Sequence, residues 1–333
     1  MDPVSTIFQS FTAYQRTAAL RGAIELDLFR AVAEGSATSE AIAARCNASP
    51  RGVRILCDYL TVLGFLRKTE GGYALDPDTG PLLDPRSPLY VGSAIRFLAS
   101  PIIVQSFADI AGTVRKGGTL VEAGGATEPE HPMWVDFARA MAPLAGLTAQ
   151  LLANQLDADA GPAWNVLDIA AGHGLFGITL AARNPRARVT ALDWANVLAV
   201  AEENAHAAGV ADRFRTLPGS AFTVDYGRDY DLVLLTNFLH HFDEEGCLAV
   251  LRKVHAALRP GGRAVTVEMI PDENRVTPPD PAAFALVMLA STPGGDAYPF
   301  SAYQRMFQRA GFARSELHPL PPSFLRAVIS YRE

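Results

Sequence analysis

Two adjacent histidines, His240 and His241, stand in the stretch LLTNFLHHFDEEG and could act in acid–base chemistry. Histidine suits this task because its ordinary pKa lies close to neutral pH. His240 follows YDLVLLTN, which is typical of a buried strand, so it is expected at the sheet edge where ligands bind. A base also needs an orienting carboxylate on its second ring nitrogen, and Glu268 ends the neighbouring run RAVTVE. His240 and Glu268 are therefore the predicted catalytic residues.

A second cluster of chemically capable residues follows the first strand, in the run Asp168-Ile-Ala-Ala-Gly172-His-Gly174. Glycines here let a ligand approach the backbone closely. The run lacks the GxGxxG spacing of a dinucleotide loop, and its acid suits a cationic amino-acid group better than a pyrophosphate. Asp193 closes the second strand, 19 residues after Gly174, where an acid commonly binds ribose hydroxyls. His173 could line this site or only fill the turn.

The elements that must position these residues change in kind along the chain. From Trp164 onward, apolar or β-branched runs alternate with helical segments, which predicts βαβ units in an α/β, Rossmann-like doubly wound sheet. The final run, ARSELHPLPPSFLRAVISY, predicts an antiparallel pair at the sheet edge. Residues 1–100 indicate short helices and a hairpin around Gly71 and Gly72, the outline of a winged helix. The predicted domains are 1–100, a helical linker at 101–155 that contributes to the pocket, and 156–333.

Composition narrows the possible functions. The net charge is −6 and the basic residues are scattered, which argues against nucleic acid and against an anionic membrane surface. No apolar run approaches the roughly 20 residues that span a bilayer, and the N-terminus lacks the pattern of a signal peptide. Three widely spaced cysteines without a CxxC motif favour reduced thiols and a cytoplasmic location. The remaining histidines lack the spacing of a metal site, so no metal is expected.

In this order, the segments resemble the S-adenosylmethionine (SAM)-dependent small-molecule O-methyltransferases, especially the plant caffeate and flavonoid type and its bacterial natural-product relatives. Residues 12–75 resemble that family's winged-helix dimerisation domain. The other matching segments are its cofactor loop VLDIAAGHG, its second acidic motif ALDWANVL, its catalytic-histidine segment LLTNFLHHFDEEGCLAVLRKVHAALRPGG, its strand-five motif VTVEMIP and its substrate segment ALVMLASTPGGDAYPFSAYQRMFQRAGF. The resemblance implies a homodimer formed through the N-terminal domain and methyl transfer to a hydroxyl of a small aromatic acceptor.

The resemblance also implies binding residues. Those for SAM are Asp168, Gly172, Gly174, Asp193, Trp194, Gly219, Ser220, Ala221, Phe222 and Asn237. Apolar and polarisable walls for the acceptor are expected from Trp134, Phe137, Met141, Met269, Met288 and Tyr298, with His241 as a further wall. Plain helix core is the alternative for these walls.

Three positions depart from the family pattern. Ser220 replaces an acid that usually contacts adenine, and Thr236 replaces a lysine that contacts the cofactor. Ala297 replaces a second glutamate that orients the base. That loss suggests a His–Glu dyad, or a nucleophile more acidic than a simple phenol. It leaves open C- or N-methylation, or a SAM-binding relative with another reaction. A DNA-binding winged helix with a ligand sensor, and a dehydrogenase, are alternatives from other classes.

Overall fold

The computed structural model describes residues 2–121 and 130–333, which form two compact units, Met1–Ser100 and Pro101–Glu333. The described part of residues 101–155, the expected helical linker, belongs to the second unit. The segment VEAGGATEPEHP, residues 121–132, has the composition of a loop and lies largely outside the described residues. Within the described residues, no helix is both long and apolar enough to cross a membrane.

The first unit consists of short helices and one hairpin. In chain order its elements are α1 Pro3–Phe11, α2 Ala13–Glu25, α3 Leu28–Ala33, α4 Ser39–Arg45, α5 Pro50–Val62, β1 Leu66–Thr69, β2 Gly72–Leu75, α6 Gly80–Leu83, a 3-10 turn Gly92–Ala94 and α7 Ile95–Leu98. The hairpin is antiparallel, as predicted. Asp27 adopts a left-handed conformation (φ 56°) and separates α2 from α3, yet Leu20, Ile24 and Leu28 still pack in one core.

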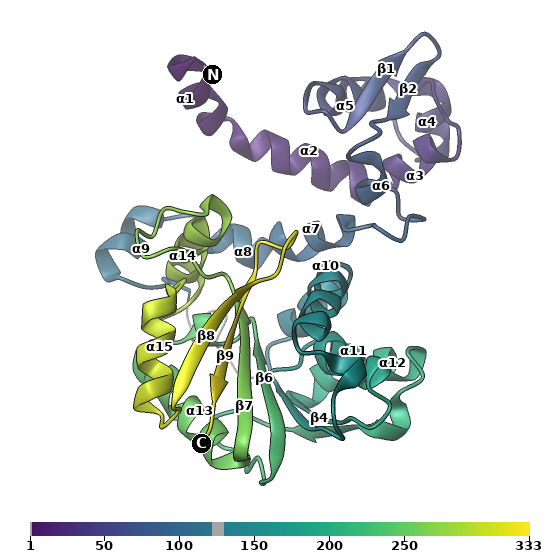
Figure 1. The fold of residues 1–333 in the computed structure, drawn as a ribbon. Coiled ribbons are helices and arrows are strands. Elements are labelled where there is room, and N and C mark those ends of the chain that lie inside the picture. Colours follow the sequence, from purple (N-terminus) through teal and green to yellow (C-terminus); the bar gives the residue numbers. More distant parts are fainter. Residues whose placement is uncertain (1, 122–129) are drawn as a thin grey trace. The chain divides into compact units, whose positions relative to one another are not determined.

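The second unit is built on a seven-stranded sheet (Figure 1). Its strands are β3 Asn165–Ile169, β4 Arg188–Asp193, β5 Phe214–Pro218, β6 Tyr230–Thr236, β7 Leu258–Glu268, β8 Arg314–Pro319 and β9 Arg326–Tyr331. The strand order is β5-β4-β3-β6-β7-β9-β8. The first five strands of that order are parallel, and β9 runs antiparallel to both of its neighbours. The predicted doubly wound sheet with a closing antiparallel pair is confirmed.

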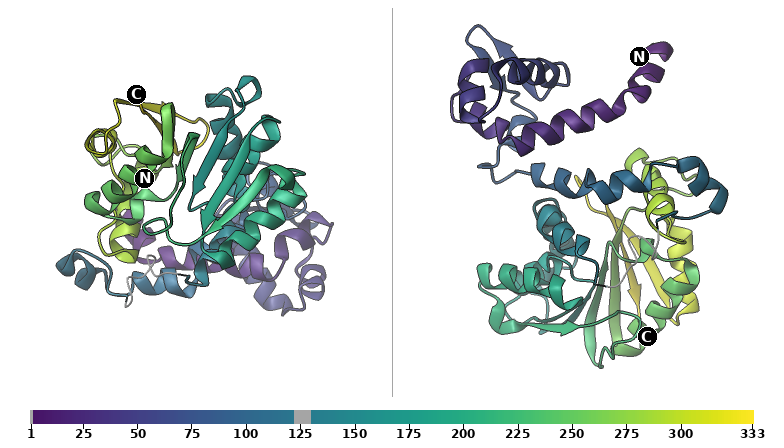
Figure 2. Two further views of the ribbon diagram at one scale, coloured as in Figure 1. Left: turned by 90° about the horizontal axis from the view of Figure 1, so that it is seen from below. Right: turned by 180° about the vertical axis from the view of Figure 1, so that it is seen from behind.

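Helices cover both faces of this sheet (Figure 1, Figure 2). The α-helices are α8 Pro101–Ser106, α9 Ile110–Lys116, α10 Met133–Gln155, α11 Leu175–Arg183, α12 Ala195–Ala207, α13 Glu244–Ala257, α14 Pro279–Ser291 and α15 Phe300–Arg309. Side chains from α10, α11 and α12 pack on one face, and those from α13 and α15 pack on the other. Alternate residues of a strand enter different cores, as Val166 and Leu167 do, which explains why the strands are apolar throughout.

One boundary differs from the sequence prediction. The segment EEGCLAVLRKVHAALRPGG has the pattern of one helix, but α13 ends at Ala257 and the residues RPGG belong to β7. The pairing of β7 with β6 shifts register between Tyr230 and Leu232, so the early part of β7 is irregular. Strands that contain Pro and Gly near such irregularities lack the usual sequence signal of a strand.

Candidate active site

A cavity lies where β3, β4, β5 and β6 end at the same sheet edge. In a parallel sheet this is the edge at which ligands bind. The residues that line it are Trp134, Phe137, Ala170, Gly172, Leu192, Asp193, Trp194, Val197, Gly219, Ser220, Ala221, Phe222, Thr236, Asn237, Phe238, His241 and Phe242. Asp193 is the one carboxylate among them, and most of the other lining residues are apolar or aromatic.

Asp193 is fixed by the loop that follows β3. Its Oδ2 accepts a hydrogen bond from the Gly172 amide (2.8 Å), and its Oδ1 accepts one from the Trp194 amide (2.7 Å). Each oxygen keeps a further lone pair for a ligand donor. Burial raises the pKa of Asp193 from 3.8 to about 6, although the two amide donors oppose that shift.

Asp168 lies at the end of β3 and is fully buried, so it does not line the cavity. Its Oδ2 accepts a hydrogen bond from the Gly177 amide (3.1 Å), while its Oδ1 is buried without a partner in the part of the chain that the structure describes. Burial raises the pKa of this carboxyl to about 7, and the nearby Asp193 adds to the shift. A buried, incompletely paired carboxyl favours a ligand that brings positive charge close to it.

The remaining residues of this loop shape it. Gly174 adopts a left-handed conformation (φ 73°), and a Cβ there would lie 2.9 Å from the Ala201 side chain, so its role is close packing on α12. It does not line the cavity. His173 is buried and its Nδ1 accepts a hydrogen bond from the Leu175 amide (3.1 Å). Burial lowers the pKa of His173 to about 4, so this neutral ring completes the turn that begins α11.

His240 and Glu268 meet at the ends of adjacent strands. Asn237 takes a left-handed conformation (φ 52°) directly after β6, which asparagine tolerates better than most residues, and turns the chain into the 3-10 segment Leu239–His241. Glu268 Oε1 accepts hydrogen bonds from the amides of Phe238 (2.9 Å) and Leu239 (2.8 Å), and Oε2 pairs with His240 Nδ1. Both side chains are buried. The structure therefore brings together the two residues that the sequence paired.

The second histidine has its own fixed orientation. His241 Nδ1 lies 3.1 Å from the Phe238 carbonyl oxygen, and because a carbonyl only accepts, Nδ1 carries the proton. The His241 ring contacts the rings of His240 (centroids 4.2 Å apart) and Trp134 (5.4 Å). Burial, followed by the charge of His240, holds the pKa of His241 well below its usual range. A neutral imidazole with an unprotonated Nε2 thus lines the cavity.

Some predicted wall residues lie elsewhere. Trp134, Phe137 and His241 line the cavity, whereas Met141, Met269, Met288 and Tyr298 do not. Sequence reasoning missed Phe238, Phe242 and Phe284, and the last packs edge-on against His240 with ring centroids 4.9 Å apart. A signal was available for Phe284, because it stands four residues before Met288 in a helix and so shares its face.

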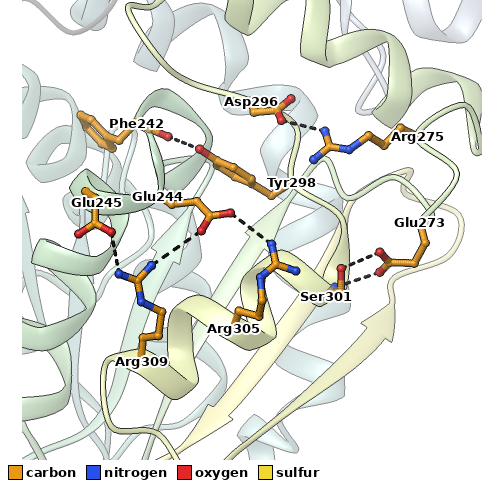
Figure 3. A network of polar contacts seen from close by, with 10 residues as sticks. All are labelled: Phe242, Glu244, Glu245, Glu273, Arg275, Asp296, Tyr298, Ser301, Arg305 and Arg309. Atoms are coloured by element: carbon orange, nitrogen blue, oxygen red, sulfur yellow. Dashed lines mark hydrogen bonds and ion pairs between the residues drawn. The ribbon is translucent and has the colours of Figure 1, made fainter.

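The segment between α14 and α15, which carries Asp296 and Tyr298 (Figure 3), bonds to the backbone at and just after the histidine pair. The Tyr298 hydroxyl donates to the Phe242 carbonyl (2.7 Å), and the Asp296 amide donates to the His240 carbonyl (3.0 Å). The Asp296 side chain pairs with Arg275 (2.8 Å) instead of approaching His240. Ala297 is fully buried. In the described residues, Glu268 is thus the one carboxylate bonded to the His240 ring.

A doubly wound sheet whose first two strands end in acids beside one cavity is typical of enzymes that bind a nucleoside cofactor. Comparison with known families gives the particular class. A model of the O-methyltransferase domain matches residues 115–313, and a model of the O-methyltransferase dimerisation domain matches residues 8–79. The chain belongs to the O-methyltransferase family, and it is a SAM-dependent methyltransferase.

Individual relatives agree with this family. The chain is 28% identical to 3-hydroxy-5-methyl-1-naphthoate 3-O-methyltransferase of Streptomyces sahachiroi, over 90% of this chain and 87% of that protein. It is also 28% identical to the tetracenomycin polyketide synthesis 8-O-methyl transferase of Streptomyces glaucescens, over 92% and 90%. The crystal structure of a candidate O-methyltransferase from Nostoc punctiforme is 49% identical, covers both chains fully and superposes with a TM-score of 0.95.

Proposed function

We propose that this enzyme transfers the methyl group of SAM to a hydroxyl group of a small aromatic acceptor, with His240 as the general base and Glu268 as its orienting carboxylate. The buried His240–Glu268 pair beside the cavity is the observation that carries the proposal. The similarity to Streptomyces O-methyltransferases, one of which acts on a hydroxynaphthoate, supports an aromatic hydroxyl as the acceptor.

The cofactor would occupy the cavity at the ends of β3 to β6. Bound SAM supplies a methyl group on a sulfonium, which is an electrophile with a good leaving group. Asp193 would accept hydrogen bonds from the ribose hydroxyls. Asp168, which lies beneath the glycine loop after β3, would attract the cationic amino-acid end of SAM. The lining residues that fit around the rest of the cofactor are Gly172, Trp194, Gly219, Ser220, Ala221, Phe222 and Asn237.

The base acts through a fixed tautomer. Because Glu268 Oε1 is occupied by two amide donors, Oε2 is left to accept the Nδ1 proton of His240. The lone pair is then on Nε2, which makes no hydrogen bond in the described part of the chain. Nε2 would take the proton of the acceptor hydroxyl as its oxygen attacks the methyl group. A positioned base of this kind contributes roughly 10²- to 10⁴-fold in rate.

The acceptor would lie against aromatic rings. Trp134 and Phe137 come from α10, Phe284 covers the His240 ring, and flat acceptors pack well on such surfaces. His241 Nε2 can accept a hydrogen bond but cannot donate one, so it favours an acceptor that carries a second hydroxyl or N–H donor. Roles for Met141, Met269, Met288 and Tyr298 in the acceptor pocket stay predictions.

One observation favours a second candidate function. No second carboxylate supports His240 in the described residues, since position 297 holds a buried alanine. A base held by a single carboxylate fits an acceptor more acidic than a simple phenol, or a SAM-dependent reaction at carbon or nitrogen. Incubation of the purified enzyme with methyl-labelled SAM and a panel of hydroxylated, aminated and carbon-nucleophile arenes tests both. A labelled methyl ether by mass spectrometry supports the first proposal, and a labelled C–CH3 or N–CH3 product contradicts it.

The assembly that we propose is a homodimer formed through the N-terminal unit. The dimerisation-domain match over residues 8–79 supports it. An exposed apolar stripe on α1 supports it independently, because such a stripe is costly in water unless another surface covers it.

A further inference from the structure

An irregular loop between β5 and β6 supplies four neighbouring lining residues of the cavity, Gly219 to Phe222. The loop belongs to no sheet ladder, so its buried carbonyl groups need donors from elsewhere. A wall built from such a loop keeps its shape only when these carbonyls are paired.

Lys253, on α13, reaches this loop from behind. Its Nζ donates to the carbonyl oxygens of Ala221 (2.9 Å) and Val224 (2.8 Å). The same ammonium lies 4.3 Å from the centre of the Tyr226 ring, a cation–π distance. The Tyr226 hydroxyl in turn donates to the Ala221 carbonyl. The Lys253 ammonium has three N–H donors. Two of them bond to the carbonyl oxygens, and the cation also contacts the Tyr226 ring.

Lys253 does not reach the cavity in which the ligand would bind. Lys253 is not among the lining residues, while Ala221 is. Desolvation by burial lowers the pKa of Lys253 and Asp225 opposes that shift, so the ammonium sits partly out of water beside the loop. Hydrogen bonds from a charged donor under these conditions are stronger than neutral ones.

We infer that Lys253 is a positioning residue for the cofactor: it holds the 219–226 loop in the shape that fits the adenosine end of SAM. The inference rests on the proposed placement of SAM in this cavity. Ser220 offers only a hydroxyl to that end, and its Oγ accepts from the Phe222 amide (3.2 Å). The shape of the loop therefore matters more here than one strong polar contact.

Equilibrium binding of S-adenosylhomocysteine by isothermal titration calorimetry tests the inference on the full chain. Lys253→Met should weaken binding about tenfold, because the two carbonyls lose charged donors. At saturating SAM its turnover should stay within about twofold of wild type, with the loss confined to the KM for SAM. Lys253→Arg, which restores a cation with several donors, should recover affinity to within about threefold.

Two further variants make the outcome decisive. Arg252→Met changes the exposed neighbour on the same helix and should bind like wild type. Tyr226→Phe removes one donor from the Ala221 carbonyl and should weaken binding by a smaller factor than Lys253→Met; this variant carries the test if Lys253→Met does not fold. Unchanged affinity in folded Lys253→Met, with only a lower melting temperature, overturns the inference. Failure of the wild type to bind S-adenosylhomocysteine would instead overturn the proposed function.

Discussion

The chemistry at His240 depends on which of its ring nitrogens carries the proton. Glu268 fixes the proton on Nδ1, so Nε2 is free to act as the base. His240→Gln removes that base, and we expect turnover to fall at least about 100-fold. The affinity for S-adenosylhomocysteine should stay within about threefold, because His240 is not among the residues lining the cavity. Turnover close to that of the wild type would contradict the assignment.

Glu268→Gln separates orientation from charge. The glutamine amide would place a donor against Nδ1 and favour the tautomer with the proton on Nε2, which cannot accept another. An analogous replacement in a serine protease lowers turnover about 10⁴-fold, and we expect a loss of about 10²- to 10⁴-fold here. The variant should keep the wild-type circular dichroism spectrum. Loss of folding would show that Glu268 acts mainly through the two amides it pairs.

The two acids at the ends of β3 and β4 predict a pH dependence for cofactor binding. Burial raises the pKa of Asp168 to about 7 and that of Asp193 to about 6, so the free protein holds both protonated below about pH 6. A cationic ligand with hydroxyl donors favours the ionised forms, so binding should release protons. Because protonation competes with binding, affinity should rise from about pH 5.5 to 7.5 and then level off.

Calorimetry in buffers of different ionisation enthalpy measures both the affinity and the released protons. Asp193→Asn should bind more weakly and lose the part of the rise centred near pH 6. The stability of the ligand-free protein should change with pH in the opposite direction. Both folded pKa values lie above 3.8, so the contribution of these acids to the free energy of unfolding falls as pH rises from about 4 to 7. An affinity that does not vary with pH would argue against a role for either acid.

At the scale of elements, the backbone of the segment before α15 packs closely against the backbone of His240. A Cβ added to Gly295 would lie 2.2 Å from the His240 carbonyl oxygen, too close for any contact. Gly295→Ala should therefore push the histidine segment away, and displacements of about 1 Å can cost 100-fold in rate. We expect turnover to fall at least about tenfold.

The affinity of Gly295→Ala for S-adenosylhomocysteine should change less than about threefold, since the loops after β3, β4 and β5 are not displaced. Gly146→Ala on α10 is the matched control, because a Cβ there meets nothing within 4 Å. Equal turnover in the two variants would show that the contact at Gly295 does not position the base.

The sequence predicted the elements better than it predicted the cavity wall. The five parallel strands were predictable because runs such as YDLVLLT are apolar on both faces, and adjacent strand ends place His240 beside Glu268. Wall residues depend on side-chain direction, which helical spacing alone does not give. The ring of Tyr298, for example, packs in a hydrophobic core, and its hydroxyl donates to the Phe242 carbonyl, so its role as an acceptor wall stays a prediction. The start of β7 was hidden by Pro260 and its glycines.

At the scale of the whole molecule, α1 carries an apolar stripe that the rest of the described chain leaves exposed. Val4, Ile7, Phe8 and Phe11 are spaced i, i+3, i+4 and i+7, and each side chain is more than half exposed. This spacing forms one continuous apolar stripe along the helix, yet α1 buries none of its residues. Tyr14, just beyond α1, is exposed as well. A stripe of this kind normally packs against another surface.

We expect a second copy of the chain to be that surface, so multi-angle light scattering should give twice the 35.6 kDa chain mass at micromolar concentration. Phe8→Asp together with Phe11→Asp should shift the equilibrium toward monomer, because two charges would be buried without partners in the interface. Val62→Asp, a change at an exposed apolar residue of α5, is the control and should stay dimeric if α1 forms the contact. A wild-type monomer would contradict the dimer, and a dimeric double variant would move the interface away from α1.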